Sequence, residues 1–263
     1  MTVVVVTRPA QEARAWVQRL EEAGWNAQSL PLIEIADAPD KAQLASARES
    51  FCRHDAVMFV SAQAVQQFWS GFDWPACAST RVWAPGPGTA TALLRQGIPA
   101  DRIDQPAQDA DQFDSEALWA KVADQVKPGR RLLVVRGTTA GADNCNAEAE
   151  QRGNGREWLS NQCRAVGGEV AWCVAYERRA PVWDVGTRTR AAALVDPQAV
   201  WLLSSTEAVN NLRALCPDVD WGCARALATH QRIADAARKL GFGEVHCTRP
   251  AVADVLHALK SMS

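Results

Sequence analysis

The segment Phe-Val-Ser-Ala-Gln-Ala-Val at residues 59–65 has a second copy, Leu-Ser-Ser-Thr-Glu-Ala-Val, at residues 203–209. In both copies a serine follows a short apolar run and precedes a stretch with helix-forming residues. The same offset of 144 residues continues without a gap from residue 61 to residue 107 and gives ten identities. Each of these residues has its partner 144 positions later: Ser61, Ala64, Val65, Arg81, Ala84, Ala90, Ala92, Gly97, Pro106 and Ala107. A register held over this length is typical of a duplicated structural unit.

The chain alternates between two kinds of segment, with approximate bounds 1–35, 40–125, 131–178 and 184–263. The second and fourth segments contain the two copies. The first and third share a different pattern, in which an apolar strand, an amphipathic helix and a second strand follow one another. Their helices stop before Gly24 and Gly168, which are again 144 residues apart. Strands that alternate with helices of this length predict two similar α/β lobes with parallel sheets. A cleft between similar lobes is a common place for a ligand.

The apolar runs of all four segments predict short buried strands. These runs lie at 3–6, 30–33, 57–60, 132–135, 170–176 and 201–204. In the second and fourth segments the strand leads directly into a helix through Ser61 or Ser205. Two stretches without periodicity, 104–116 and 137–155, predict surface loops.

The composition describes a soluble globular protein of 263 residues, with 48% hydrophobic and 22% charged residues and a formal net charge of −2. This charge predicts neither a nucleic-acid nor a membrane partner, and no apolar stretch is long enough to cross a bilayer. The first nine residues lack the basic start of an export signal, so we expect a cytoplasmic protein. The eight cysteines contain no Cys-x-x-Cys pair, and we interpret them as buried free thiols rather than as metal ligands or a disulfide scaffold.

Hydroxyl side chains occur where predicted strands turn into helices: Thr7, Ser61, Thr89, Ser205 and Thr229. One interpretation is that each hydroxyl caps its helix by accepting a hydrogen bond from an early amide. The other is that these junctions bind a ligand, because open α/β sheets bind ligands at the carboxyl ends of their strands. Free helix amides at such positions suit carboxylates and phosphates. The two interpretations are compatible, and both stay open at this point.

Three further residues near strand ends are candidates to bind an anion. Arg8 and Arg232 can each pair with a ligand carboxylate, and His230 lies in the same loop as Arg232. The glycine loop at 84–90 lacks the third glycine of a dinucleotide-binding motif. The sequence contains no recognisable nucleophile, catalytic triad or metal cluster, so we predict neither a metal nor a cofactor.

Tyr176 is the only tyrosine in a chain with eleven tryptophans. On a regular strand its side chain shares a face with Val170, Trp172 and Val174 and lies at the end of the segment. It either packs at a junction between lobes, with its hydroxyl bonded to a backbone group, or takes part in chemistry.

Short motifs in this order and spacing resemble the uroporphyrinogen-III synthase family over nearly the whole chain. The motifs are Val-Thr-Arg-Pro at 6–9, Phe-Val-Ser-Ala-x-Ala-Val at 59–65, Gly-x-x-Thr-Ala at 86–90, Arg-Gly at 136–137, Gly-Arg-Glu at 155–157, Val-Ala-Tyr-Glu at 174–177 and Ala-Thr-His-Gln-Arg-Ile at 228–233. The chain departs from the family in a longer insertion at 138–154 and in Gln231, where many bacterial relatives have proline.

The resemblance implies two α/β lobes joined by a two-stranded connector. The first segment would pair with the fourth, and the second with the third. Lobe 1 would then consist of 1–35 and 180–263, and lobe 2 would be the inserted stretch 36–179. The connector strands would be 28–36 and 170–181, with Tyr176 at the cleft.

The resemblance also implies an activity: cyclisation of hydroxymethylbilane to uroporphyrinogen III, with inversion of ring D, loss of water and no cofactor. In that family a tyrosine matching Tyr176 lies near the departing hydroxyl, and residues matching Ser61, Thr89, Ser205 and Thr229 line the cleft. We therefore expect a monomeric enzyme that holds a flexible polycarboxylate mainly through backbone amides and hydroxyls, with arginines secondary. The alternative from another class is a non-catalytic, two-lobed intracellular binder of small anions.

Overall fold

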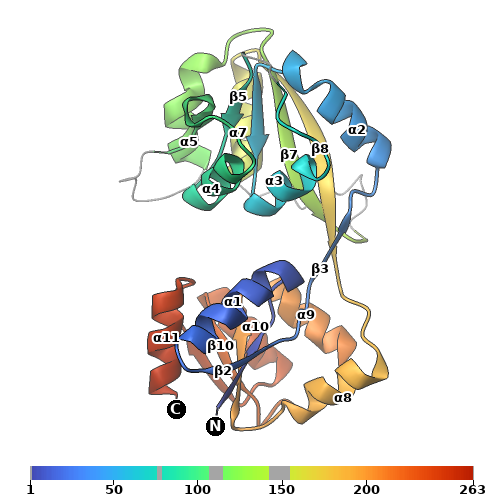
Figure 1. Cartoon of the computed structure of the whole chain (residues 1–263), viewed down its shortest axis with the longest axis vertical. Coiled ribbons are helices and arrows are strands. Elements are labelled where there is room, and N and C mark those ends of the chain that lie inside the picture. The colour runs from blue at the N-terminus through green and yellow to red at the C-terminus, as the bar shows by residue number, and fades with distance from the viewer. Residues whose placement is uncertain (1, 76–78, 107–114, 142–154, 263) are drawn as a thin grey trace. The chain divides into compact units, whose positions relative to one another are not determined.

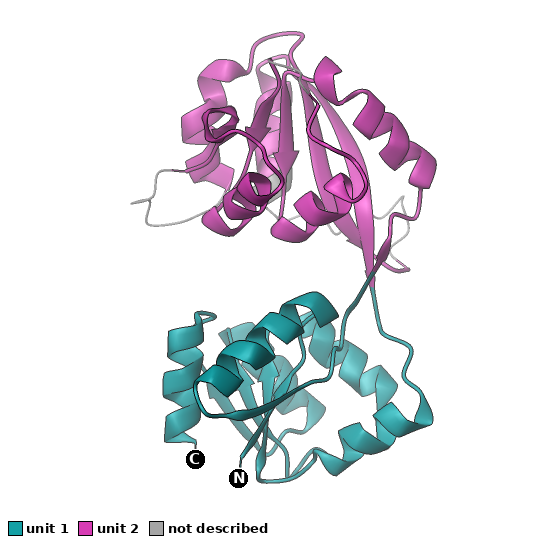
Figure 2. Ribbon diagram, in the orientation of Figure 1, with its two compact units in different colours: residues 1–35, 179–263 teal, residues 36–178 magenta. Residues whose placement is uncertain are grey.

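The computed structural model describes residues 2–75, 79–106, 115–141 and 155–262. The chain divides into two compact units: unit 1 contains Met1–Ile35 and Arg179–Ser263, and unit 2 contains Ala36–Arg178 (Figure 2). The backbone therefore passes between the units at two points. The predicted division assigned Arg179 to the inserted lobe, whereas its contacts place it in unit 1. Of the predicted loops at 104–116 and 137–155, residues 107–114 and 142–154 lie outside the described residues. The ends of both loops were predicted wrongly, because residue 104 and residues 137–139 belong to strands and residues 115, 116 and 155 belong to helices.

Unit 1 is built on a parallel five-stranded sheet with the order β11-β10-β9-β1-β2. Figure 1 labels β10 and β2 of this sheet. Its strands are β1 (Val3–Val6), β2 (Asn26–Ser29), β9 (Ala199–Leu203), β10 (Arg225–Ala228) and β11 (Glu244–Cys247). Its helices are α1 (Ala10–Glu22), α8 (Val185–Ala193), α9 (Thr206–Leu215), α10 (Gln231–Leu240) and α11 (Val252–Ser261).

Alternate residues of the unit 1 strands belong to two different cores, one on each face of the sheet. Val4 and Val6 pack with Trp16 of α1 and Leu259 of α11, whereas Val5 packs with residues of α8, α9 and α10. Period-two alternation of this kind follows from the pleat of a strand. Because both faces are covered, the strands are apolar on both sides, as is typical of parallel sheets.

The predicted strand at 30–33 is wrong. β2 ends at Ser29, and the next strand, β3 (Glu34–Asp37), begins after Ile33. The N–H groups of Leu30 and Leu32 still donate hydrogen bonds to the carbonyls of Val6 and Thr7, at 2.9 and 3.1 Å. These two bonds advance by only one residue on the side of β1 for two residues of the run, so the regular register of the ladder is lost after Leu30. The apolar run is nevertheless buried, and this burial produced the strand-like pattern in the sequence.

Unit 2 contains a six-stranded sheet with the order β3-β8-β7-β4-β5-β6. Its other strands are β4 (Ala56–Phe59), β5 (Arg81–Trp83), β6 (Ile103–Asp104), β7 (Arg131–Thr139) and β8 (Glu169–Arg179). Its helices are α2 (Lys41–Glu49), α3 (Ala62–Trp69), α4 (Pro87–Arg95), α5 (Ser115–Val122) and α7 (Gly155–Ala165). Its described residues also form the 3-10 turns η1 (Phe51–Arg53), η2 (Ala100–Arg102) and η3 (Ala123–Gln125). Strands β4 to β8 pair in parallel.

The two sheets repeat one another. The order β6-β5-β4-β7-β8 in unit 2 corresponds to β11-β10-β9-β1-β2 in unit 1. Helix α4 begins at Pro87 and α10 begins at Gln231, which is the same 144-residue offset as in the sequence. The first segment of the chain thus pairs with the fourth, and the second with the third. The predicted duplication and its crossed pairing are confirmed.

The two predicted connector strands are only partly present. Over 28–36 the extended stretch is interrupted, and β3 covers only Glu34–Asp37, whereas β8 begins at Glu169 and is paired along its length with β7. β3 and β8 are neighbours in the sheet, and Glu34 and Arg179 form an ion pair of 2.6 Å.

The cysteines follow the predicted pattern in part. Cys163, Cys173 and Cys216 are buried free thiols, as expected. Cys223 and Cys247 are also free but exposed, and Cys52 is disulfide-bonded, so the prediction is wrong for these three.

Within the described part of the chain, no helix combines the length and apolarity that a membrane span requires.

The two duplicated serines provide a matched test of helix capping. Ser61 accepts a hydrogen bond of 3.2 Å from the N–H of Ala64, whereas Ser205 makes no such side-chain bond to α9. Loss of a capping hydroxyl costs about 1 kcal/mol. We expect Ser61→Ala to lower the free energy of unfolding by about this amount and Ser205→Ala to lower it by less than about 0.5 kcal/mol. Urea unfolding followed by circular dichroism measures both, and equal losses would contradict the assignment.

Candidate functional site

The carboxyl ends of three neighbouring strands of unit 2 bring Tyr176, Gly137 and Ser61 together. Tyr176 lies on β8, Gly137 on β7, and Ser61 follows β4 as the N-terminal cap of α3. Because β8, β7 and β4 are parallel neighbours, their carboxyl ends meet at one edge of the sheet. This edge is where open α/β sheets bind ligands. The phenol is nearly enclosed there, with 4% of Tyr176 exposed.

A shift of register between β7 and β8 determines which way Tyr176 points. Arg136 pairs with Val174, but the next residue, Gly137, pairs with Tyr176, so Ala175 is an extra residue in β8. An extra residue of this kind is a β-bulge, and it moves the following side chain to the other face of the sheet. The prediction that Tyr176 shares a face with Val170, Trp172 and Val174 is therefore wrong.

The bulge places the tyrosine ring directly over Gly137. A Cβ atom at position 137 would overlap three carbons of the ring, Cζ, Cε1 and Cε2. Only glycine leaves room for this contact, and the backbone of Gly137 does not need a positive φ to make it. The glycine is thus required by close approach rather than by backbone conformation.

The phenol reaches across β7 to the serine at the end of β4. The hydroxyl oxygens of Tyr176 and Ser61 are 3.4 Å apart. The Ser61 oxygen already accepts the N–H of Ala64, so its own proton can be donated to the phenol oxygen. In that arrangement Tyr176 can donate its phenol proton to a ligand. The hydrogen bonds from Ala64 to Ser61 and from Ser61 to Tyr176 then polarise one another, so that each strengthens the other.

The turn that carries Ser61 is held by aromatic packing. Phe59, the last residue of β4, meets Phe68 of α3 edge to face at 5.3 Å. Phe68 also lies 5.2 Å from Trp69, with their rings nearly perpendicular. Arg48 donates hydrogen bonds to the carbonyls of Gln67, Phe68 and Ser70 at the end of α3. These contacts position the serine independently of any ligand.

The other polar groups near Tyr176 are engaged or neutral. On the opposite face, the guanidinium of Arg136 lies 5.2 Å from the ring centre of Trp172. Arg178 lies on the same face as Tyr176, two residues further along β8, and donates to Thr139 at 3.0 Å. Cys173 lies on the face of Tyr176, but burial raises the pKa of its thiol to about 12. The thiol is therefore protonated at neutral pH and cannot serve as a nucleophile there.

The predicted hydroxyls differ in whether they are already bonded. Thr7 is fully buried and donates to the carbonyl of Leu202 at 2.7 Å, which joins β1 to β9. The side chains of Ser205, Thr229 and Thr89 make no hydrogen bond that the structure records. Ser205 and Thr229 follow β9 and β10 at the carboxyl edge of the unit 1 sheet, and Thr89 lies in the first turn of α4 in unit 2.

His230 caps α10 in place of a hydroxyl. Its Nδ1 accepts a hydrogen bond of 3.1 Å from the N–H of Arg232. This bond requires a lone pair on Nδ1 and therefore assigns the proton to Nε2, which is left as an exposed donor. The guanidinium of Arg232 is exposed and forms no ion pair with any residue that the structure describes. In contrast, the Arg8 side chain contacts two residues of α1. Its Nη1 lies 3.2 Å from the carboxylate oxygen of Glu12, and its guanidinium carbon lies 4.7 Å from the ring centre of Trp16.

The predicted site residues thus form two sets, one in each unit. Unit 2 holds Tyr176, Ser61 and Thr89, and unit 1 holds Arg8, Ser205, Thr229, His230 and Arg232. Sequence reasoning missed Gly137 and the bulge beside it. The Arg-Gly pair at 136–137 was the one available signal, because a glycine inside a strand often marks a bulge or a close approach. Among the described residues, no three histidine, cysteine or acidic side chains are grouped as metal ligands would be.

Comparison with known proteins gives one consistent result. The family model described as uroporphyrinogen-III synthase HemD matches residues 14–256. A uroporphyrinogen-III synthase of Salmonella typhimurium is 29% identical over 96% of this chain and 97% of its own length. The Escherichia coli enzyme of the same name is 27% identical over the same shares.

Two solved structures share the fold. A uroporphyrinogen-III synthetase from Helicobacter pylori aligns over the whole of both chains with a TM-score of 0.63 and 12% identity. A mutant uroporphyrinogen III synthase from Thermus thermophilus covers this chain fully and 98% of its own length, with a TM-score of 0.54 and 16% identity. At these identities the likeness concerns the fold alone, and it agrees with the predicted two-domain α/β class.

The contact between Gly137 and Tyr176 can be tested through stability. We expect Gly137→Ala to cost about 1–3 kcal/mol of unfolding free energy, because the new methyl group overlaps the ring. Tyr176→Ala removes the ring, so adding Gly137→Ala to it should cost much less. Chemical unfolding of the two single variants and the double variant measures this coupling. Additive losses would show that the ring does not lie over the glycine.

Proposed function

The chain belongs to the uroporphyrinogen-III synthase family, and we propose that Tyr176 is the residue with which it carries out the loss of water from its substrate. The enzyme is a cyclising lyase of tetrapyrrole biosynthesis. It closes the linear hydroxymethylbilane into uroporphyrinogen III with inversion of ring D.

The reaction needs a proton donor at the departing hydroxyl. Breaking the carbon–oxygen bond leaves its electron pair on oxygen, and hydroxide is a poor leaving group unless it receives a proton. The adjacent pyrrole nitrogen stabilises the resulting cation by forming an azafulvene. We propose that the phenol proton of Tyr176 goes to the departing oxygen, which leaves as water. The cation attacks the carbon of ring D that already carries the bridge to ring C, and the bond from that carbon to the bridge then breaks and leaves a second azafulvene cation on ring C. This cation attacks the free carbon of ring D, which inverts the ring, and the proton released from that carbon restores the phenol.

One observation carries this role: the hydroxyl of Tyr176 lies at the carboxyl edge of the sheet, 3.4 Å from the Ser61 hydroxyl. When Ser61 donates to the phenol oxygen, it favours the charge that develops on Tyr176 during proton transfer. Ser61 then acts by positioning and polarising the phenol. No residue of this scheme requires a metal or a cofactor.

We propose that the remaining predicted residues bind the carboxylates of the substrate. In unit 1 these are the hydroxyls of Ser205 and Thr229, the Nε2–H of His230 and the guanidinium of Arg232, and in unit 2 the hydroxyl of Thr89. These groups are either free of recorded side-chain bonds or, for His230, bonded through one nitrogen only. Arg8 has a smaller part, because Glu12 already pairs with it. We also propose that the enzyme is monomeric and cytoplasmic.

Tyr176→Phe tests the catalytic assignment, because it keeps the ring over Gly137 and removes only the hydroxyl. A positioned general acid contributes roughly a hundredfold to ten-thousandfold. We expect a loss near the lower end, since the pyrrole itself stabilises the cation. The measurement is the rate of uroporphyrinogen III formation from enzymatically generated hydroxymethylbilane, with the isomers separated. Undiminished activity in a folded variant would leave Tyr176 with a structural role only.

Absence of activity in the unaltered chain would instead favour the non-catalytic binder.

A double-variant comparison separates Ser61 from other contacts. If Ser61 acts only through the phenol, Ser61→Ala slows the enzyme in the presence of Tyr176 but has no further effect in Tyr176→Phe. Asp184→Ala is the control, because it removes the cap of α8, where Asp184 accepts the N–H of Thr187 at 2.7 Å, and α8 carries none of the proposed site residues. Thermal stability is followed for all variants, so that loss of the Ser61 cap is not mistaken for loss of chemistry.

Arg232→Ala tests carboxylate binding, with Arg238→Ala on the same helix as its control. Arg238 already forms an ion pair of 3.0 Å with Asp235, whereas Arg232 is exposed. Exposed ion pairs contribute up to about 1 kcal/mol, so we expect KM to rise by no more than about fivefold in Arg232→Ala. The value of kcat should change little, because the contact exists in both ground and transition states. An equal rise of KM in Arg238→Ala would show that the effect is one of net charge.

A further inference from the structure

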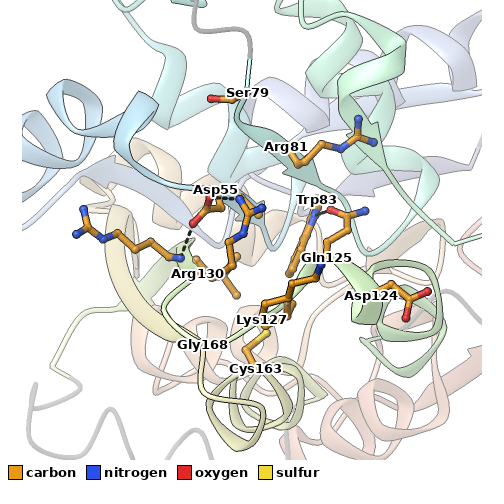
Figure 3. Close-up of a pocket in the computed structure, with 14 residues that line it drawn as sticks. Asp55, Ser79, Arg81, Trp83, Asp124, Gln125, Lys127, Arg130, Cys163 and Gly168 are labelled. Carbon is orange, nitrogen blue, oxygen red and sulfur yellow. Dashed lines mark hydrogen bonds and ion pairs between the residues drawn. The ribbon is translucent and has the colours of Figure 1, made fainter.

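Unit 2 contains a cavity of about 430 Å³ at the edge of its sheet opposite to Tyr176 (Figure 3). Ala56, Arg81 and Arg131 line it, and they are the first residues of β4, β5 and β7. Gly168, which immediately precedes β8, also lines it. The cavity therefore lies at the amino ends of the strands, whereas the residues proposed for catalysis lie at their carboxyl ends. It is separate from the site described above.

The inner wall of the cavity is apolar and uncharged. Trp83, Leu132 and Cys163 line it and are each at least 96% buried. Burial raises the pKa of the Cys163 thiol to about 11, so this side chain is neutral at physiological pH. The indole N–H of Trp83 donates to the side-chain oxygen of Gln125 at 3.3 Å, which leaves the amide NH₂ of Gln125 as a donor.

The rim of the cavity carries more positive than negative charge. Four cations line it, namely Arg81, Lys127, Arg130 and Arg131, against two carboxylates, Asp55 and Asp124, so the lining has a formal charge of +2 (4 − 2). The whole chain, by comparison, has a net charge of −2. Two carboxylates just outside the lining, Asp104 and Glu169, pair with Arg81 and Arg131 and offset this charge.

Most of these cations already have partners, and Lys127 does not. Arg81 forms two hydrogen bonds with the carboxylate of Asp104, at 2.8 and 2.5 Å. Asp55 accepts a hydrogen bond from the side chain of Arg130, and the guanidinium of Arg131 lies 3.7 Å from the carboxylate of Glu169. Lys127 is exposed and forms no ion pair with the described residues. Its ammonium group is therefore the cation that is available to an incoming anion.

We propose that this cavity binds a planar aromatic or heteroaromatic anion with one carboxylate. The ring would lie against Trp83, Leu132 and Cys163, and the carboxylate would pair with Lys127 at the rim. A cavity of this size falls within the range of small-molecule sites, about 300–1,000 Å³. An apolar wall with a few convergent polar groups is also the usual composition of such sites. The space suits a ligand of one or two rings, so its ligand differs from the linear tetrapyrrole.

Isothermal titration of the full-length protein with indole-3-acetate tests the proposal. We expect one molecule to bind, Lys127→Glu to weaken binding at least about tenfold, and indole-3-acetamide, which lacks the charge, to bind more weakly. Lys121→Glu is the matched control, since Lys121 is an exposed lysine of α5 that does not line the cavity. It should bind indole-3-acetate as the unaltered protein does. Both lysines are exposed, so both variants should fold and keep their synthase activity.

Four results would overturn the proposal. The first is a failure of millimolar indole-3-acetate to bind. The second is an equal effect of Lys127→Glu and Lys121→Glu, which would make the effect one of net charge. The third is loss of binding in Tyr176→Phe, which would place the ligand at the carboxyl edge instead. Inorganic phosphate should not compete, because it lacks the ring; competition at equal concentration would likewise contradict recognition of an aromatic anion.

Discussion

The register of β8 against β7 shifts by one residue at Ala175, and the orientation of the Tyr176 phenol depends on this shift. A regular pairing would point the phenol to the face where Arg136 lies over Trp172. The bulge turns it to the face of Gly137, which has no side chain to obstruct the ring. The same face continues to the end of β4, where Ser61 meets the hydroxyl. One extra residue thus assembles three strands into one site, as bulges often do beside functional residues.

The duplicated units use equivalent positions for different purposes. The residue 144 positions before Tyr176 is Leu32, which is fully buried in a core of unit 1. In unit 1 the equivalent strand stops at Ser29, before Pro31, whereas β8 continues to Arg179. A similar divergence separates the caps of α4 and α10, where Gly86 corresponds to His230. The shared backbone supplies two similar strand edges, and local changes give them different side chains.

Several features of the fold could be predicted from the sequence because they depend on local patterns. The 144-residue offset indicated the duplicated sheets, and the glycine stops located the ends of α1 and α7. The bulge could not be predicted, because register depends on pairing with a strand distant in sequence and alanine at 175 is compatible with either register. The strand predicted at 30–33 was wrong because burial, rather than pairing, makes that run apolar. The cavity at the amino edge brings together residues from four separated segments, which no spacing in the sequence indicates.

The single tyrosine has a practical consequence for spectroscopy. Since the chain contains one tyrosine, and that residue lies at the carboxyl edge of unit 2, every tyrosine signal originates at the candidate active site. Protein labelled with isotopic tyrosine would give one set of ring resonances, free of overlap from the eleven tryptophans. The rate at which this ring flips over Gly137, and the proton on its oxygen, could be followed during turnover without introducing any label foreign to the protein. The ring of Tyr176 therefore serves as a spectroscopic probe at the position where the chemistry is proposed to occur.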